Sequence, residues 1–277
     1  MGVAVQYGLY LPPFGPFGDP GVVVDLAVRA EAAGWDGVFL WDHLVHDDLA
    51  VVDPWTTLAA VAQATTRIRI GPMVTPPARR RPWVLARQAA TVARLSVGRL
   101  VLGTGLGSDE SGDFRRFGEP ADLGERVGRY DEGLQIIDAV WSGQPYRHRG
   151  RHFEVDLGAG VPVPEPIPVW VAASTEHPAV RRRASSRDGI FLNLPGRPPT
   201  PAGVRALVED LHRLPVAPRP GFDVVVAGNA SPAWDEPTTI DLPGLVAAGM
   251  TWWMESLIHF DPLELSLKIV EAGPPRA

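Results

Sequence analysis

Eight short apolar runs alternate with segments of helical spacing along the whole chain, and this alternation constrains the fold more than any other feature. Within the runs, polar and apolar residues rarely alternate, which is typical of parallel strands whose two faces are both covered. Eight strand–helix units in 277 residues, about 35 residues each, predict an α/β fold, a (β/α)8 TIM barrel formed by a single domain over residues 1–277. The predicted strands are residues 4–10, 37–41, 68–74, 99–104, 167–172, 189–193, 222–227 and 250–254.

An open, doubly wound sheet is the other arrangement that such alternation allows. An open sheet that binds a dinucleotide would carry a G-x-G-x-x-G turn after its first strand. Here that turn is LPPFGPFGDP, which lacks this spacing. The sequence therefore favours the closed barrel.

Residues that begin and end helices support the same division of the chain. Pro82 and Pro201 are predicted to open two helices, and Gly34 and Gly249 to end two others. The longest helix is expected over residues 122–142. Three more helices are predicted to begin at an N-cap aspartate followed by proline, at Asp19-Pro20, Asp53-Pro54 and Asp261-Pro262.

Two stretches are longer than a minimal barrel unit requires. Residues 105–121 form a long loop after the fourth predicted strand, rich in glycine and charge, and are expected to act as a lid over the site. Residues 143–166 contain YRHRGRHFEV, whose Arg149-Gly150 predicts a hairpin inserted before the fifth predicted strand. Because the hairpin follows a helix, we expect it on the opposite face, in a structural role.

Composition excludes several classes of partner. The net charge of -6 argues against nucleic acid, which requires a basic face. No apolar run approaches the roughly 18 residues that span a bilayer, and the N-terminus lacks the pattern of a signal peptide. The absence of cysteine excludes disulfides, a thiolate nucleophile and thiolate-bound metal. A cytoplasmic protein that binds neither nucleic acid nor membrane is expected.

In a barrel of this kind, the chemistry lies at the carboxyl ends of the strands. The residues predicted there are mostly small and carry hydroxyl or amide groups, with a single imidazole. They lack the histidines and carboxylates on several strands that a metal hydrolase needs, so no metal is expected. These strand ends are Tyr10-Leu11, Asp42-His43, Thr75-Pro76, Thr104-Gly105, Ala173-Ser174-Thr175, Asn193, Gly228-Asn229 and Glu255.

Two of these strand ends allow both a structural and a functional interpretation. His43 could be a hydrogen-bonded structural group or a proton-transfer catalyst, since its ordinary pKa lies near neutrality. Ser174-Thr175 could be an ordinary N-cap or a phosphate site at a helix N-terminus. At most one of Arg181, Arg182 and Arg183 could extend a positive field toward that phosphate, because neighbouring residues on a helix point in different directions. The interpretation we favour for these three arginines is a solvated helix face. His46, Asp47 and Asp48 lie on one loop and are interpreted as residues at the rim.

Long segments of the chain resemble the luciferase-like monooxygenase superfamily, whose members bind flavin mononucleotide (FMN) or the deazaflavin coenzyme F420 in a (β/α)8 barrel. The resemblance covers nearly the whole chain, and its longest blocks are specific. It is carried by AEAAGWDGVFLWDHL (30–44), IRIGPMVTP (68–76), RQAATVARLSVGRLVLGTGLG (87–107), FRRFGEPADLGERVGRYDEGLQIIDAVWSGQPYRHRGRHFEV (114–155) and PEPIPVWVAAS (164–174).

The resemblance implies a set of site residues. Asp42 and His43 would lie beside the coenzyme ring as the catalytic pair, with His43 transferring the proton. A backbone bulge at Pro72, Met73 and Val74 would support the ring, with a cis peptide expected between Pro72 and Met73. The remaining implied cofactor contacts are Thr75, Thr104, Gly105 and Asp109 at the ring or ribityl chain, and Ala173, Ser174 and Thr175 at the phosphate.

The chain also departs from the superfamily in ways that bear on its substrate. In the F420-dependent sugar-phosphate dehydrogenases an acid follows the GTG of the fourth strand, whereas this chain has Leu106. The lysines that bind the sugar phosphate in that branch cannot be present, since Lys268 is the single lysine. Both departures argue against glucose 6-phosphate oxidation. Glu176-His177 replaces the Gly-Gly found in several F420 binders, which leaves the cofactor open between F420 and FMN.

We therefore expect an oxidoreductase that transfers a hydride between F420 and a small organic substrate, with His43 as proton donor or acceptor. One alternative is a monooxygenase that uses reduced FMN and O₂. Another is a non-catalytic flavin-binding barrel, which the replacement at Leu106 keeps open. A homodimer is expected, because dimers are usual among the proteins that this chain resembles.

Overall fold

Eight parallel strands form a barrel in the computed structural model, which describes residues 5–163, 165–173, 177–193, 197–234 and 240–275. In the sheet the strands follow the order β3-β2-β1-β10-β9-β8-β7-β4. Bridges from Ile70 to Leu100 and from Thr75 to Thr104 join the two edge strands and close the barrel. The predicted (β/α)8 TIM barrel is thus confirmed. Its strands are β1 (Gln6–Leu11), β2 (Gly37–Leu40), β3 (Arg69–Pro72), β4 (Leu102–Thr104), β7 (Val169–Ala173), β8 (Gly189–Leu192), β9 (Asp223–Gly228) and β10 (Trp252–Ser256).

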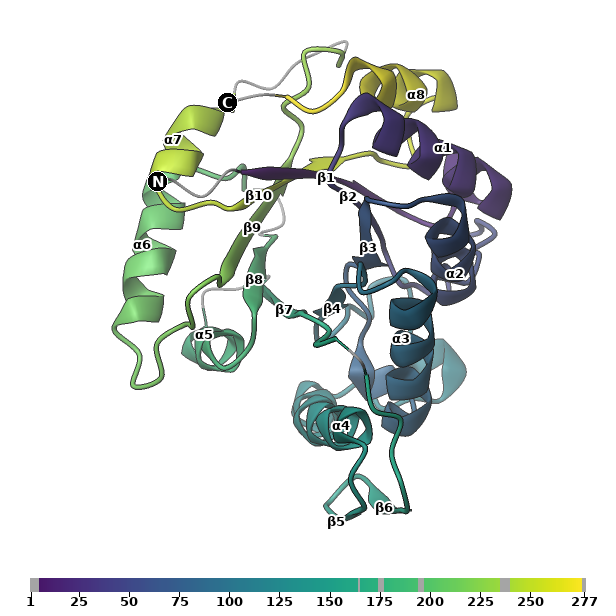
Figure 1. Ribbon diagram of the computed structural model, residues 1–277, viewed down its shortest axis with the longest axis vertical. Coiled ribbons are helices and arrows are strands. Elements are labelled where there is room, and N and C mark those ends of the chain that lie inside the picture. The colour runs from purple at the N-terminus through teal and green to yellow at the C-terminus, as the bar shows by residue number, and fades with distance from the viewer. Residues whose placement is uncertain (1–4, 164, 174–176, 194–196, 235–239, 276–277) are drawn as a thin grey trace.

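One helix follows each barrel strand, and Figure 1 shows these helices around the outside of the strands. Among the described residues, three short 3₁₀ turns lie in the connections: η1 (Gly15–Phe17), η2 (Pro77–Arg79) and η3 (Arg115–Phe117). No helix in the described part of the chain is long and apolar enough to cross a membrane. The helices are α1 (Pro20–Ala33), α2 (Pro54–Ala64), α3 (Pro82–Leu95), α4 (Leu123–Ser142), α5 (Pro178–Ser185), α6 (Pro201–His212), α7 (Leu242–Ala247) and α8 (Leu263–Ala272).

Most of the predicted helix ends are confirmed. The Asp19 and Asp53 side chains accept N–H groups at the starts of α1 and α2, and Gly34 ends α1 in the left-handed conformation with φ +92°. The predicted cap at Asp261 is wrong. Here Pro262 occupies the N-cap position and α8 begins at Leu263, so that helix starts without a side-chain cap.

Large side chains fill the inside of the barrel. They alternate along the strands with residues that face the helices, so each strand has both faces covered, as the apolar runs predict. At the β3–β4 seam the strands come unusually close. A Cβ at Gly71 would lie 2.0 Å from the Val101 carbonyl oxygen, and one at Gly103 would lie 2.3 Å from the Pro72 carbonyl oxygen. The interior cluster consists of Tyr10, Phe39, Met73, Val101, Trp170, Phe191, Val225, Trp252 and Met254.

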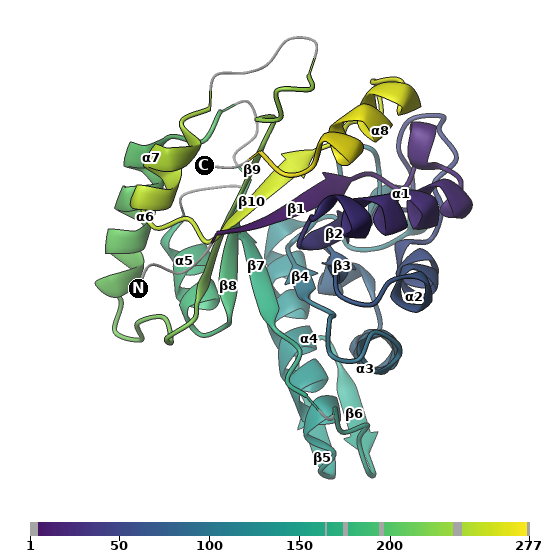
Figure 2. The same cartoon turned by 45° about the horizontal axis from the view of Figure 1, so that its top comes forward.

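The predicted hairpin is formed by β5 (Tyr146–Arg149) and β6 (Glu154–Leu157). It leaves the end of α4 and runs back alongside that helix, as Figure 2 shows. Its turn reaches the first half of α4, where Arg151 Nη2 donates to Glu125 at 2.5 Å and the Phe153 N–H donates to Glu132 at 3.1 Å. The hairpin therefore does not stay at the opposite face, and its turn approaches the loops at the carboxyl end of the barrel.

Candidate active site

A buried carboxylate, Asp42, lies just beyond the end of β2. Its side chain is fully buried, and both carboxylate oxygens accept hydrogen bonds. The Thr75 hydroxyl donates to Oδ2, Arg79 Nη2 donates to Oδ1 at 2.8 Å, and Arg80 Nη2 lies 2.7 Å from each oxygen. A carboxylate with this many donors holds its partners in place, so Asp42 organises the site around it.

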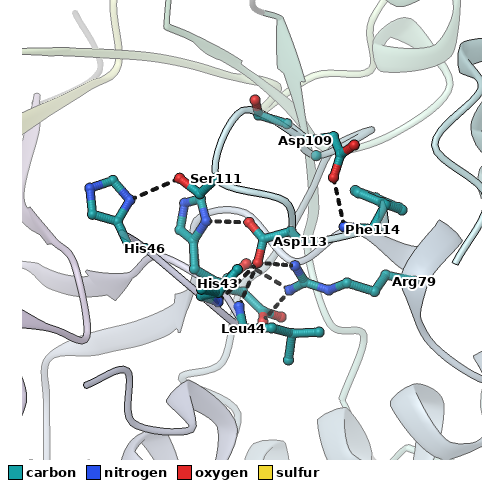
Figure 3. A network of polar contacts seen from close by, with 12 residues as sticks. His43, Leu44, His46, Arg79, Asp109, Ser111, Asp113 and Phe114 are labelled. Carbon is teal, nitrogen blue, oxygen red and sulfur yellow. Dashed lines mark hydrogen bonds and ion pairs between the residues drawn. The ribbon is translucent and has the colours of Figure 1, made fainter. Parts of the chain in front are cut away.

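The next residue, His43, contacts a second buried carboxylate, Asp113 in the 105–121 loop (Figure 3). His43 Nδ1 lies 2.5 Å from Asp113 Oδ2. The Leu44 N–H donates to Asp113 Oδ1 at 2.6 Å, which fixes the carboxylate against the backbone of the β2 loop. A carboxylate at Nδ1 selects the tautomer that carries its proton on Nδ1, and this leaves Nε2 for exchange with a ligand.

Arg79 joins the two carboxylates. Its Nη1 lies 3.0 Å from Asp113 Oδ1, while its Nη2 donates to Asp42, and its side chain is only 3% exposed. Burial lowers the pKa of the Arg79 guanidinium, and the charges of Asp42 and Asp113 oppose that shift. Burial by itself would raise the pKa of Asp113, but hydrogen bonds from His43 and Leu44 and the charge of Arg79 bring that pKa below its ordinary value. Asp113 is therefore held as an anion, and both buried acids contact the same buried guanidinium.

Two adjoining cavities occupy the barrel mouth. The smaller, of about 290 Å³, is lined by His43, Asp42 and Asp113, among others. The larger, of about 770 Å³, extends toward α5. The two cavities adjoin each other, because five residues line both: Tyr10, Val74, Gly107, Ser108 and Asn193.

The larger cavity combines an apolar wall with a basic end. Val74, Leu106 and Val171 contribute to the wall, and Arg126 and Arg183 contribute the positive charge. Arg183 is paired with Asp131, with Nε 2.6 Å from Oδ1. Arg126 donates to the Gly107 carbonyl at 2.9 Å, and its buried Nε has no hydrogen-bond partner among the described residues. Such a space suits a flat ring with an anionic tail. Of the three arginines at 181–183, Arg183 lines this cavity, while the phosphate site predicted at Ser174-Thr175 lies outside the described residues.

Apart from Asp109, the predicted cofactor residues divide into three groups. Asp42, Met73, Val74 and Gly105 line the cavities. Pro72, Thr75, Thr104 and Ala173 lie in or next to the strands behind them; Thr75 and Thr104 are fully buried, and the Thr104 hydroxyl is 2.8 Å from that of Tyr130. Ser174 and Thr175 lie outside the described residues. Burial raises the pKa of Tyr130 to about 12, so its phenol stays neutral.

Asp109 lies in the loop but lines neither cavity. Its carboxylate accepts the Phe114 N–H at 2.8 Å and pairs with Arg115 Nε at 2.7 Å, so it shapes the turn of the loop. Phe114 is fully buried, with the guanidinium carbons of Arg79 and Arg126 lying 6.0 Å and 5.0 Å from its ring centre. The loop is thus packed against the site, while its role as a lid stays a prediction.

A cis peptide bond lies in the expected bulge after β3, but one residue later than predicted. It joins Met73 to Val74, not Pro72 to Met73. The Met73 N–H still donates to the Leu40 carbonyl at 2.6 Å. That hydrogen bond extends the β2–β3 hydrogen-bonding pattern to Met73, and the cis bond follows it.

The rim histidine His46 contributes more to the site than the sequence indicated. It stacks on Phe14 with ring centres 4.3 Å apart, lies 3.3 Å from the Ser111 hydroxyl, and lines the smaller cavity. Within the described ranges, no three histidines or carboxylates are grouped so that they could hold a metal ion.

Sequence reasoning missed three of the residues that organise this site: Asp113, Arg79 and Arg80. The 105–121 loop holds four acids, and nothing in their spacing distinguishes Asp113 from the others. Arg79 and Arg80 belong to a run of three arginines just before α3, which could have drawn attention as a block of charge next to a strand end.

The sequence of this chain is similar to those of known proteins. A family model described as luciferase-like monooxygenase matches residues 7–237. An F420-dependent glucose-6-phosphate dehydrogenase from Nakamurella multipartita is 33% identical over 188 residues, which are 65% of this chain and 54% of that protein. One from Beutenbergia cavernae is 36% identical over 180 residues, 61% of this chain and 51% of that protein. The chain thus matches about half the length of these curated relatives.

Solved structures share the fold over nearly the full chain. An F420-dependent secondary alcohol dehydrogenase in complex with an F420–acetone adduct has a TM-score of 0.76 at 16% identity, with 97% of each chain covered. The F420-dependent tetrahydromethanopterin reductase from Methanopyrus kandleri has a TM-score of 0.75 at 17% identity, also with 97% of each chain covered. At these identities the likeness concerns the fold alone.

Proposed function

The chain belongs to the luciferase-like monooxygenase family, and on that premise we propose that it is an F420-dependent oxidoreductase acting on a small organic substrate. In this proposal a hydride passes between coenzyme and substrate, and His43 moves the accompanying proton. The proposal is carried by the contact between His43 and the buried Asp113 at 2.5 Å, on the wall of the smaller cavity.

The barrel mouth fits such a coenzyme. A volume of about 770 Å³ lies within the range of about 300 to 1,000 Å³ typical of cofactor sites. Its apolar wall suits a flat ring, while Arg126, with its buried unpartnered Nε, and Arg183 suit the anionic tail. When bound, F420 would supply the carbon that accepts or gives up the hydride.

The protein's own residues would position the substrate and handle the proton. His43 Nε2 would take a proton from the substrate during oxidation and return it during reduction. Asp113 holds the imidazole in the required tautomer, and Asp42 with Arg79 holds Asp113 in place. We assign His43 the catalytic role and Asp42 and Asp113 positioning roles.

The substrate proposed here is not a sugar phosphate. Leu106 lines the larger cavity as an apolar residue, where the sugar-phosphate dehydrogenases that the chain resembles have an acid. The single lysine of the chain, Lys268, lies on α8. A cytoplasmic location remains a prediction from composition, and a homodimeric state remains a prediction of the family resemblance.

Cofactor binding is the direct test. We expect the protein to quench the fluorescence of oxidised F420 saturably and to bind FMN more weakly. Preferential FMN binding, with substrate-dependent O₂ consumption when the flavin is reduced, would favour the monooxygenase alternative. If neither coenzyme binds, the oxidoreductase proposal fails.

Replacing His43 tests the proton-transfer role. We expect His43→Ala to bind the coenzyme as the unmodified protein does and to lose about 100-fold or more in turnover, the usual contribution of a general acid or base. His212→Ala, at an exposed position on α6, serves as the matched control and should retain full turnover. Unchanged turnover in His43→Ala would remove this residue from the mechanism.

A further inference from the structure

A separate cavity of about 170 Å³ lies outside the barrel mouth, where η2, the start of α3, the first half of α4 and the hairpin turn meet. Arg79 lines both this cavity and the smaller active-site cavity, and so forms part of the wall between them. We call it the outer arginine cavity. Its charged and aromatic lining consists of Arg79, Arg80, Arg81, Glu119, Arg129 and Phe153.

The charges around the outer arginine cavity are not balanced. Arg79 and Arg80 are paired with the buried acids of the active site, but Arg81 forms no ion pair with a carboxylate among the described residues. Arg129 has one distant partner, with its Nη1 3.8 Å from Glu119 Oε2. The Arg129 Nε is buried and has no hydrogen-bond partner within the described ranges. Of these two guanidiniums, Arg129 therefore has one loosely placed carboxylate partner, and Arg81 has none among the described residues.

The N-terminus of α3 adds to this positive field. A helix N-terminus carries partial positive charge and is usually capped by an acid or a hydroxyl. At the start of α3 the N-cap is Arg81, no side chain caps the helix, and the first turn contains no acid. A cation at this position is unfavourable by itself, and an anion bound in the cavity would offset it.

Aromatic rings, more than carboxylates, hold the two guanidiniums in place. The Arg81 guanidinium carbon lies 5.9 Å from the Trp83 ring centre, and that of Arg129 lies 5.9 Å from the ring centre of Phe153. Trp83 and Phe153 meet edge to face, with their centres 6.1 Å apart. Ring contacts orient a guanidinium without occupying its N–H groups, so these donors stay available for an anion.

We propose that the outer arginine cavity is a binding site for a phosphate dianion, either free phosphate or the terminal phosphate of a monoester. Arg81 and Arg129 provide charge-assisted hydrogen bonds, and the uncapped N-terminus of α3 provides the helix dipole. The site is distinct from the coenzyme cavity at the barrel mouth. The proposal goes beyond the proposed function and does not depend on it.

Calorimetric titration of the full chain with inorganic phosphate, at constant ionic strength, tests this site. We expect saturable binding, and Arg81→Gln and Arg129→Gln should each weaken it about tenfold, as expected when one charge-assisted hydrogen bond is lost. Arg147→Gln is the matched control: it removes the same charge from the nearby hairpin, where Arg147 is 84% exposed and pairs with Asp156. It should change the affinity less than twofold.

A second measurement, the thermal midpoint of unfolding, distinguishes lost phosphate binding from misfolding of a variant. A ligand that binds only the folded state raises the thermal midpoint, so phosphate should raise that of the unmodified protein and of Arg147→Gln, and should raise those of the other two variants by less at the same phosphate concentration. Phenyl phosphate as the ligand identifies a monoester source if it binds as tightly as free phosphate; if it does not bind, free phosphate is the ligand. Equal phosphate affinity in all four proteins, or acetate binding as tightly as phosphate, would overturn the proposal.

Discussion

Arg79 and Arg81 are two residues apart in the chain, yet they differ in their partners. Two carboxylates pair with the Arg79 guanidinium, whereas no carboxylate among the described residues pairs with Arg81. Arg79 is almost fully buried and lies between two buried carboxylates, Asp42 and Asp113. Arg81 is exposed, caps no helix donor with its side chain, and lies over the ring of Trp83.

The difference follows from the dielectric environment of each charge. A buried guanidinium is tolerable only when acids and hydrogen bonds compensate it completely, and the compensated group then becomes a fixed part of the framework. A guanidinium at the surface is stabilised by water and can stay unpaired, which leaves it free to bind a ligand. The inner arginine therefore organises the candidate catalytic pair, while the outer one belongs to a surface that can recognise an anion.

The largest effect on stability is expected when Arg79, the cation between Asp42 and Asp113, is replaced. Arg79→Met leaves Asp42 and Asp113 buried without their shared cation, which should cost about 3 to 5 kcal/mol of unfolding free energy. Urea unfolding measures this loss. Arg81→Met is the matched control and should change the free energy by less than about 0.5 kcal/mol, as expected for a surface position. Similar losses in both variants would show that the contrast between the two arginines is wrong.

A smaller but more specific effect is expected from the carboxylate beside His43. Asp113→Asn keeps the shape of the side chain but no longer favours the Nδ1–H tautomer of the imidazole, so turnover should fall by about 100-fold. Coenzyme binding should stay within twofold, because Asp113 faces His43 and Arg79 and does not line the larger cavity.

Stopped-flow kinetics and fluorescence titration separate these two quantities. Asp109→Asn, in the same loop, is the comparison variant, since that carboxylate shapes the turn and contacts no catalytic group. If turnover depends on Asp109 as strongly as on Asp113, then ordering of the loop explains the loss, and the pairing with His43 does not.

The smallest effect is expected when Arg81 is replaced. Arg81→Ser replaces a cation at the N-cap of α3 with a good capping residue, which should raise the unfolding free energy by about 1 kcal/mol. Urea unfolding in phosphate-free buffer gives the number, with Arg147→Ser in the hairpin as the control. A destabilised Arg81→Ser protein would mean that the arginine already stabilises the helix start without any bound anion.

Much of the fold could be predicted from local sequence, because each barrel strand and the helix after it form a local unit. The apolar runs gave the eight strands, and Asp19, Asp53 and Gly34 gave helix ends from interactions within a few residues. The prediction failed at Asp261, where Pro262 takes the cap position itself. It also misplaced the cis bond by one residue, since the β2–β3 pairing extends to Met73.

The candidate site could be predicted only in part. A side chain at the carboxyl end of a barrel strand faces the mouth whatever its neighbours are, so the position of His43 followed from the strand pattern. Its partner Asp113 lies 70 residues away, in a loop with several acids and no periodicity. Which of those acids is buried against the imidazole depends on how the loop packs, with Phe114 fully buried beside Arg79.

By itself, then, the sequence determined the barrel, the face on which we expect the chemistry, and the position of His43 beside Asp42 at the end of the second strand. These follow from hydrophobic burial and short-range capping, which depend on neighbours in the chain. Only the tertiary structure decided that Asp113 and Arg79 complete the pairing around His43, and that Arg81 and Arg129 converge on an unbalanced cavity. Charge balance is a property of space and of local dielectric, so spacing along the chain could not supply it.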